Sequence, residues 1–224
     1  MSTPLSDAPG EALPLLYSFR RCPYAMRARL AVLASGVRCE LREIVLRDKA
    51  PAFLAASPKG TVPVVVTAGG DVIEQSLDVM HWALEQNDPG DWLSPDGVVQ
   101  AAMDDLIAEC DGPFKDSLDR YKYANRYEGA DPIAERAKAE VFLRKLEERL
   151  AKTRYLCGEQ ICLADMAIAP FVRQFANVDR AWFDGQDWPR LIGWLEAFLA
   201  SERFEAIFKK YPQWHAGDAP TVFP

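Results

Sequence analysis

The sequence predicts an α/β domain followed by an all-helical domain, with a short polar linker between them. Three observations lead to this fold class. Segments that alternate apolar and polar residues, or that form short apolar runs, occur only before residue 75. The span 87–97 is rich in Pro, Gly and Asp, which indicates a linker. After it, no segment has the pattern of a strand, and the apolar residues recur at helical spacing.

The first domain is expected at residues 13–86. Residues 13–19 form an apolar strand, and Pro23 then opens a helix that ends near Ser35, before Gly36. The elements that follow are a strand at 37–46, a short helix at 49–56, a hairpin of strands at 62–67 and 72–74, and a helix at 77–86 capped by Ser76. The resulting order, β-α-β-α-β-β-α, is that of a thioredoxin-like domain.

The second domain is expected at residues 98–224 and to be all-helical, whereas residues 1–12 form a flexible tail. Its helices are predicted at 98–123, 132–151, 162–176, 189–200 and 202–210. A bend is expected in the first of them at Gly112-Pro113. The helix at 162–176 is mostly apolar, which predicts a central position in the bundle.

The composition excludes several classes of protein. The formal charge of −7, with no basic run beyond Arg20-Arg21, argues against a nucleic-acid partner. No apolar run has membrane-spanning length and the first residues lack the features of a signal peptide, so we expect a cytoplasmic protein that binds no membrane. Only two histidines and no C-x-x-C pair are present, so we expect no metal site and no dithiol redox motif.

Cys22 is the candidate reactive residue because it stands between a strand and the proline that opens a helix. At such an N-cap the unpaired backbone N–H groups and the helix dipole favour a thiolate, and Arg20 and Arg21 add positive charge. We therefore predict that the pKa of Cys22 lies below that of a free thiol. A buried structural cysteine is the alternative. The other cysteines lie in segments predicted to be remote or buried: Cys39, Cys110, Cys157 and Cys162.

Four motifs, in this order and at these distances, resemble those of the cytosolic glutathione transferases, over roughly residues 13–210. They are Cys22-Pro23-Tyr24-Ala25, similar to the C-P-[FY]-[AS] motif of the cysteine-type, omega-like members; Gly60-Thr61-Val62-Pro63-Val64, similar to a G-x-V-P segment with a cis proline; Gln75-Ser76, similar to an [ED]-S pair; and Gly158 followed by Leu163-Ala164-Asp165, similar to a second-domain motif. Two residues depart from the family pattern. Gln75 replaces a carboxylate, and Cys162, a poorer cap acceptor, stands where the family has a Ser or Thr helix cap, so Asp165 is expected to carry more of that helix start.

The resemblance implies that glutathione is the co-substrate, bound by the first domain. An extended peptide of this kind would pair with the backbone at Val62, and its γ-glutamyl carboxylate would meet the helix that begins at Ser76. Its glycine carboxylate needs a cation, for which Arg47 matches best and Lys49 and Lys59 are alternates. The residues expected to contact glutathione are Pro23, Tyr24, Arg47, Lys59, Val62, Pro63, Gln75 and Ser76. Candidates for an acceptor pocket are the aromatic residues Phe114, Tyr121, Tyr123, Tyr127 and Trp182, which at helical spacing are equally compatible with a core.

The favoured function is a homodimeric thiol transferase, in which Cys22 forms a mixed disulfide with glutathione taken from a protein or small-molecule disulfide. Reduction of a dehydroascorbate-type substrate is a close variant. Because Ala25 replaces the second cysteine of a dithiol enzyme, external glutathione is expected to resolve the adduct. Two alternatives remain. One is glutathione conjugation or dehalogenation of an electrophile, aided by the hydroxyl of Tyr17 or Ser18; the other is a non-enzymatic scaffold of the same fold that binds a protein partner.

Overall fold

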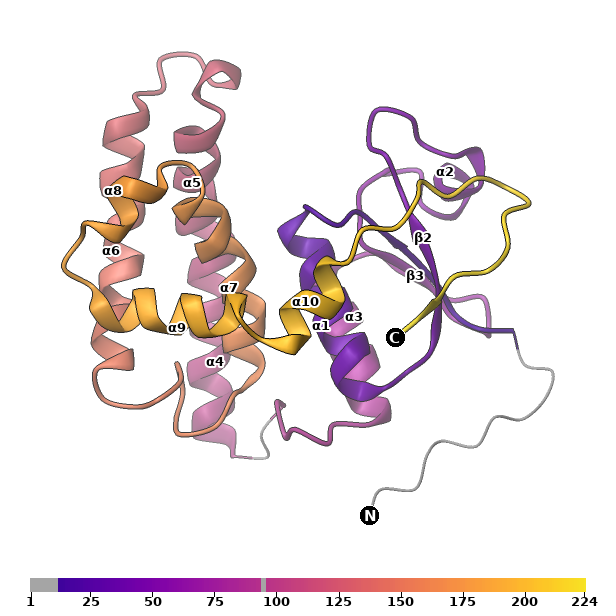
Figure 1. Ribbon diagram of the computed structural model, residues 1–224, viewed down its shortest axis with the longest axis horizontal. Helices are drawn as coiled ribbons and strands as arrows, with labels where there is room; N and C mark the ends of the chain where they lie inside the picture. The colour runs from indigo at the N-terminus through magenta and orange to yellow at the C-terminus, as the bar shows by residue number, and fades with distance from the viewer. Residues whose placement is uncertain (1–11, 94–95) are drawn as a thin grey trace.

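The computed structural model describes residues 12–93 and 96–224. Figure 1 shows an α/β part, which contains the first strands and helices, beside a part made of helices. The C-terminal segment leaves the helices and runs back along the α/β part, where the chain ends (Figure 1). In the described ranges, none of the helices combines the length and the apolar character needed to cross a membrane.

One mixed sheet of five strands organises the α/β part, in the order β4-β3-β1-β2-β5. The central strand, β1, pairs in parallel with β2 and antiparallel with β3, and both pairings include Leu16, which lies opposite Leu41 and Val65. The strands are β1 (Leu15–Ser18), β2 (Cys39–Glu43), β3 (Val64–Val66), β4 (Val72–Ile73) and β5 (Val222–Phe223).

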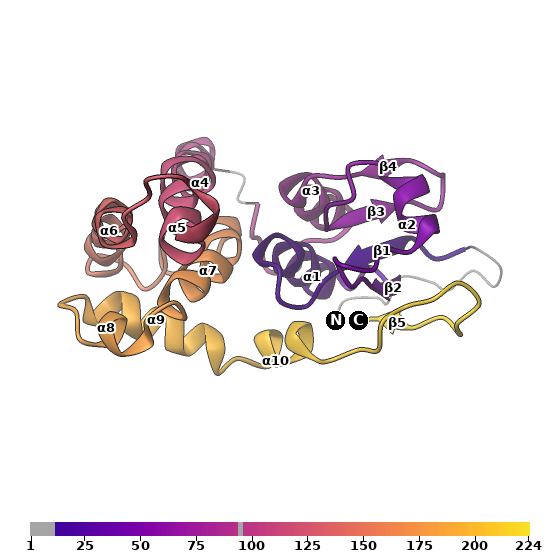
Figure 2. The ribbon, with the colours of Figure 1, turned by 90° about the horizontal axis from the view of Figure 1, so that it is seen from above.

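The two faces of the sheet bury different helices. On one face, Leu16 and Val65 pack against α1 (Pro23–Ser35) and α3 (Ser76–Gln86). On the other face, Tyr17 packs with Phe53 of α2 (Pro51–Ala56), with 5.3 Å between the ring centroids. Because successive strand residues point to opposite faces, the apolar run of β1 serves both layers. Figure 2 shows α1 and α3 side by side between the sheet and the helical part.

The helical part surrounds α7, a helix whose residues are nearly all buried. On one side α7 contacts α1, where the Nε of Arg27 donates a 2.7 Å hydrogen bond to the carbonyl oxygen of Ala167. The segments are α4 (Gly97–Glu109), the π-helical turn η1 (Cys110–Phe114), α5 (Lys115–Lys122), the 3-10 turn η2 (Ala124–Arg126), α6 (Pro132–Leu150), α7 (Leu163–Ala176), α8 (Arg180–Asp184), α9 (Pro189–Leu199) and α10 (Glu202–Phe208).

Most of the predicted elements are present in the predicted order. The helix expected over 23–35 has these bounds, and Gly36 ends it with a positive φ of 72°. The bend expected at Gly112-Pro113 is confirmed, because Gly112 has non-helical angles (φ −95°, ψ −106°) between α4 and α5. The central position of the helix at 162–176 is also confirmed.

Three details differ from the sequence prediction. Beyond residue 97 no strand was expected, yet Val222 and Phe223 form β5, which pairs antiparallel with β2. Helix α8 was not predicted. Ser76 is the first residue of α3, and Gln75 occupies the N-cap position that was expected for Ser76. The predicted tail falls outside the described residues apart from Ala12, and the predicted linker is described except at 94–95.

Two fully buried arginines of α1 connect the parts. Arg27 forms a bidentate ion pair with Asp111 of η1, at 2.6 and 2.8 Å. Arg29 pairs with Glu43 of β2 and donates a 3.0 Å hydrogen bond to the carbonyl oxygen of Ile207 in α10. Helix α1, which begins next to Cys22, is therefore held from both parts of the molecule.

Candidate active site

Cys22 lies at the N-cap of α1, as predicted. Its backbone is extended (φ −79°, ψ 123°), and Pro23 occupies the first turn of the helix. In the part of the chain that the structure describes, the Cys22 side chain makes no capping hydrogen bond, but the nearby backbone N–H groups of Ala25 and Tyr24 lower its pKa. The thiol itself lies 3.8 Å from the carbonyl oxygen of Val62, to which it donates. The strand-Cys-Pro-helix order thus places the Cys22 sulfur at the N-terminus of α1.

The pKa of Cys22 is raised, not lowered as the sequence suggested. Burial of the thiol is the largest effect and raises the pKa, whereas the N–H groups of the helix end and the cation of Lys115 lower it by less. The expected contribution of Arg20 does not arise, because its guanidinium lies over the ring of Phe208, 4.6 Å from the centroid. Desolvation therefore raises the Cys22 pKa by more than the helix end lowers it.

A cavity of about 490 Å³ opens beside Cys22 and is bounded by both parts of the chain. Aromatic rings and cations dominate its walls. Arg126 lies 4.2 Å from the ring centroid of Tyr123, and Lys115 pairs with Asp119 on the same wall. The lining residues are Phe19, Arg21, Cys22, Pro23, Tyr24, Leu46, Lys115, Asp119, Lys122, Tyr123, Arg126, Tyr127 and Gln174. Such a surface suits an anionic molecule with apolar portions.

The aromatic candidates for the acceptor pocket divide into two groups. Tyr123 and Tyr127 line the cavity beside Cys22. Phe114 and Tyr121 lie in the core instead, where both rings pack on Phe175 at centroid distances of 5.8 and 5.3 Å. Trp182 is turned toward the same core and packs edge-on against Trp188, so it is not part of the lining. Helical spacing alone does not separate these groups, because a helix that borders a cavity also has a core face.

The peptide bond between Val62 and Pro63 is cis, as the resemblance implied. Both residues are buried, directly before β3 and within reach of Cys22 through the 3.8 Å contact. Gly60, with φ of 62°, makes the turn that leads into this segment. A Cβ at Gly60 would lie 3.1 Å from the Nζ of Lys49, so the Lys49 side chain covers this turn.

The remaining predicted contacts lie around this turn and at the start of α3. Arg47 and Lys59 are both exposed. Ser76 is buried, and its hydroxyl accepts a 3.5 Å hydrogen bond from Arg27. Gln75 is exposed and borders an open cavity of about 610 Å³ with Glu74 and Asp78.

Four charged residues of the cavity were missed in the sequence: Lys115, Asp119, Lys122 and Arg126. A signal for part of this wall was present. Lys115 and Asp119 stand four residues apart and Lys122 follows at three, which is the spacing of one helix face. Gln174 was also missed, and its buried amide oxygen has no hydrogen-bond partner among the described residues.

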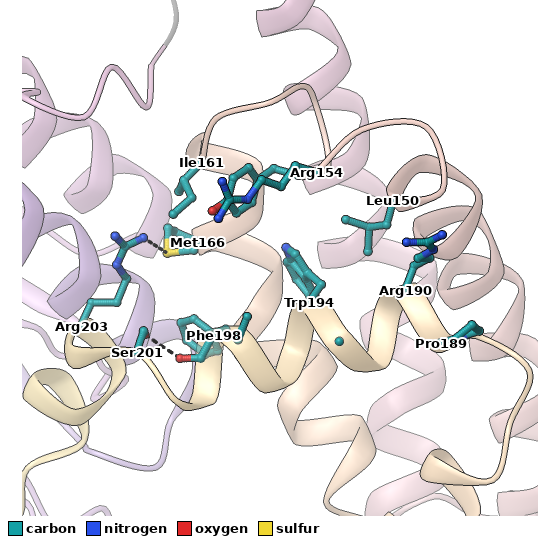
Figure 3. Close-up of a pocket in the computed structure, with 13 residues that line it drawn as sticks. Leu150, Arg154, Ile161, Met166, Pro189, Arg190, Trp194, Phe198, Ser201 and Arg203 are labelled. Atoms are coloured by element: carbon teal, nitrogen blue, oxygen red, sulfur yellow. Dashed lines mark hydrogen bonds between the residues drawn. The ribbon is translucent and has the colours of Figure 1, made fainter.

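A third cavity, of about 620 Å³, lies in the helical part and does not include Cys22. Figure 3 shows Trp194 and Phe198 of α9 along one side and Arg154 and Ile161 opposite them. Arg203 reaches in beside Met166, with its Nη1 4.0 Å from the sulfur. The cavity is apolar with a cationic rim.

Two family models match the chain. "Glutathione S-transferase, N-terminal domain" matches residues 16–92, and "Glutathione S-transferase, C-terminal domain" matches residues 131–197. The chain is 28% identical over 209 residues to glutathione S-transferase omega-1 of Sus scrofa. The aligned region covers 92% of this chain and 84% of the relative. The chain is 30% identical over 203 residues to maleylacetoacetate isomerase of Rattus norvegicus, with 86% and 90% covered.

Solved glutathione S-transferase structures have the same fold as this chain. A glutathione S-transferase from Methylobacillus flagellatus, solved with glutathione bound, superposes with a TM-score of 0.74 at 21% identity and covers 87% of this chain and 98% of its own. Four observations point to the same family. They are the two family models, the relative matched across 90% of its length, and the cis Val62-Pro63 segment beside Cys22. The chain belongs to the glutathione S-transferase family.

Proposed function

We propose that this chain is a glutathione-dependent thiol transferase whose nucleophile is Cys22. The single observation that carries the proposal is the position of the Cys22 sulfur, at the free end of α1 and on the wall of a cationic, aromatic cavity. The similarity to an omega-1 enzyme along most of the chain supports it. Glutathione is the co-substrate, and a disulfide that carries a glutathionyl group is the favoured acceptor.

The reaction has two exchange steps. The Cys22 thiolate attacks the glutathionyl sulfur of a mixed disulfide, the S–S bond breaks, and the substrate leaves as a thiol after it takes up a proton. A second glutathione then attacks the Cys22–glutathione disulfide, which yields oxidised glutathione and restores the Cys22 thiol. Ala25, one helical turn into α1, offers no thiol that could resolve the adduct. In the dehydroascorbate-type variant, the same cycle would move two electrons from two glutathione molecules to the acceptor.

Glutathione would lie along the segment that contains the cis Val62-Pro63 bond. Its γ-glutamyl carboxylate would meet the N-terminus of α3, an 11-residue helix that begins at Ser76. The closeness of Lys49 to Gly60 favours Lys49 over Arg47 or Lys59 as the cation for the glycine carboxylate. Pro23 and Tyr24 would line the thiol end, because both border the cavity with Cys22.

The geometry disfavours conjugation through a hydroxyl of β1. The Tyr17 hydroxyl accepts a 2.8 Å hydrogen bond from Arg42, and the Ser18 hydroxyl accepts a 2.7 Å hydrogen bond from Arg29. Both residues are buried, so neither hydroxyl is available to a glutathione thiolate. Conjugation and dehalogenation remain the second enzymatic candidate, and the 490 Å³ cavity has room for an electrophile.

Two measurements distinguish a thiol transferase from a non-enzymatic scaffold. The enzyme would be retained on immobilised glutathione and would turn over a glutathionylated peptide, with loss of turnover in Cys22→Ser. A scaffold would show neither. We also propose that the enzyme is a homodimer in the cytoplasm, an inference from the family; light scattering would then give about twice the 25.1 kDa of one chain.

A further inference from the structure

Two cysteines outside the candidate active site are brought together by one carboxylate. Cys157 and Cys162 belong to the loop between α6 and α7. One oxygen of Asp165 accepts a 3.1 Å hydrogen bond from the backbone N–H of Leu156, directly before Cys157. The other oxygen accepts a 3.1 Å hydrogen bond from the backbone N–H of Cys162. Asp165 therefore fixes the backbone beside both thiols.

The two cysteines flank the Asp165 carboxylate and differ in their exposure. Both are free, Cys157 is half-buried and Cys162 is buried. The Cys162 thiol also lies 3.1 Å from the Oδ2 of Asp165. The neighbouring Cys162 thiol and the positive charge of Arg149 lower the pKa of Cys157, whereas the neighbouring Cys157 thiol, burial and the charge of Asp165 raise the pKa of Cys162. Cys157 is thus the more acidic and the more accessible thiol, and Cys162 is the more buried one.

We propose that Cys157 and Cys162 form a second thiol–disulfide site, which a small disulfide such as oxidised glutathione converts to an intramolecular disulfide. This site lies apart from Cys22 and does not depend on the function proposed for it. Cys157 is the attacking residue and Cys162 is the resolving residue. The arrangement is the one that low-pKa, accessible thiols with a nearby resolving thiol have in redox-active proteins.

The chemistry needs no reagent beyond the disulfide. The Cys157 thiolate attacks one sulfur of oxidised glutathione, so its S–S bond breaks and one glutathione leaves as a thiolate that takes up a proton. The Cys162 sulfur then attacks the Cys157 sulfur of the mixed disulfide, and the second glutathione leaves and takes up the Cys162 proton. The protein loses two electrons and two protons, and oxidised glutathione becomes two molecules of glutathione.

The surroundings favour an anionic disulfide. Arg149 of α6 donates a 3.4 Å hydrogen bond to the carbonyl oxygen of Leu156, which keeps a cation beside Cys157. The same loop forms part of the wall of the 620 Å³ cavity through Tyr155 and Ile161, and Arg154 stands on its rim (Figure 3). Glutathione carries two carboxylates, so this cationic loop attracts it.

The sequence did not reveal this pair. Four residues lie between the two cysteines, so they match no C-x-x-C motif, and both were expected to be remote or buried. They are brought near each other by the turn in which the Tyr155 N–H donates a 2.9 Å hydrogen bond to the carbonyl oxygen of Gly158, and by the two oxygens of Asp165, which bind the backbone beside each cysteine. The expectation that external glutathione resolves the adduct therefore applies to Cys22 but not to this loop.

The test uses the full chain with Cys22→Ser, so that only the second site can respond. The protein is incubated with oxidised glutathione, its remaining thiols are blocked with N-ethylmaleimide under denaturing conditions, and it is digested with trypsin. Both cysteines fall in the single peptide 155–173. We expect this peptide to lose two hydrogens and to take up no N-ethylmaleimide. Adding Cys162→Ser should instead trap one glutathionyl group on Cys157, because the resolving thiol is gone.

Cys157→Ser is the matched control, and it should leave Cys162 alkylated by N-ethylmaleimide with no adduct. Serine at position 162 restores the residue type that the resembling family uses as a helix cap, so that variant should fold. The proposal is overturned if peptide 155–173 keeps two alkylatable thiols while, in the chain with Cys22 intact, Cys22 becomes glutathionylated under the same conditions. It is also overturned if Cys162→Ser shows no adduct on Cys157. Either result leaves the role of Cys22 untouched.

Discussion

At Cys22, burial and the helix end act in opposite directions on the same sulfur. The N–H groups of Tyr24 and Ala25 and the charge of Lys115 stabilise the thiolate, but desolvation is larger and raises the pKa. The sequence predicted the stabilisation of the thiolate by the helix end, because the Cys-Pro pair that starts the helix can be read from the residues. It could not predict the burial, which depends on how closely Val62 and the wall of the cavity approach the sulfur.

The first prediction concerns this balance. The rate of Cys22 alkylation by iodoacetamide should rise with pH and have its midpoint above the value of about 8.5 for a free thiol, since the thiolate forms only as the pH passes the raised pKa. Lys115→Met should move the midpoint higher because it removes the stabilising cation. Lys122→Met is the matched control, because Lys122 lines the same cavity but is not among the groups that shift the Cys22 pKa. A midpoint below 8.5, or equal shifts in both variants, would contradict this account.

The second prediction separates two neighbours at the start of α3. Ser76→Ala should weaken glutathione binding about tenfold or more, because a hydrogen bond to a charged group contributes about 1.5–3 kcal/mol. Gln75→Ala should weaken it less, since a neutral amide offers no charge to the glutathione ammonium group. Isothermal titration calorimetry with glutathione measures both. The reverse order of affinities would exclude the proposed contact between the carboxylate and the N-terminus of α3.

At the scale of elements, the sequence predicted those helices and strands whose bounds depend only on residues within the same segment. The helix at 23–35 and its stop at Gly36 follow from Pro and Gly signals. Strand β5 has two residues, and only its pairing with β2 makes it a strand. The sorting of the aromatics has the same cause. Tyr121 and Tyr123 stand two residues apart, and only the packing of α5 on Phe175 decides which one enters the core.

Helix α7 begins with a capping box, in which the Cys162 side chain accepts from the backbone N–H of Asp165 and the other half is made by Asp165. Its carboxylate accepts hydrogen bonds from the N–H groups of Leu156 and Cys162 and, at 2.9 Å, from the indole of Trp194. A single buried side chain therefore holds the preceding loop, the helix start and α9 together.

The third prediction follows from this carboxylate. Asp165→Ala should lower the free energy of unfolding by about 3 kcal/mol, because several buried donors lose their acceptor. The control is Asp131→Ala at the exposed start of α6, which removes cap bonds of 2.9 and 3.3 Å and should cost about 1 kcal/mol. Urea denaturation followed by circular dichroism compares the two variants. Equal losses would show that Asp165 acts as an ordinary helix cap.

At the scale of the whole molecule, the two parts are joined through α1. Arg29 reaches β1, β2 and α10 at once, and the backbone N–H of Trp214 donates a 2.9 Å hydrogen bond to the carbonyl oxygen of Glu43. The C-terminal segment that follows α10 is thereby fixed on the sheet (Figure 1). These long-range contacts are invisible in the sequence, where Arg29 is one polar residue in a helix of mostly apolar ones.

The fourth prediction tests this connection. Glu43→Gln should destabilise the fold by about 3 kcal/mol, because it leaves the buried Arg29 charge without its carboxylate. Asp184→Asn is the control, since it breaks an exposed pair with Arg180 and should change stability by at most about 1 kcal/mol. Thermal unfolding at one pH and one salt concentration compares them. A loss of less than about 1 kcal/mol in Glu43→Gln would rule out a structural role for the pair.

The central claim is that Cys22 forms a mixed disulfide that only external glutathione resolves. After exposure to oxidised glutathione, mass spectrometry of the tryptic peptide 22–27 gives the most direct test. We expect one glutathionyl group on Cys22, removed by added glutathione, and no turnover of a glutathionylated peptide by Cys22→Ser. An unmodified Cys22, or a disulfide that joins Cys22 to any other cysteine of the chain, would contradict the account.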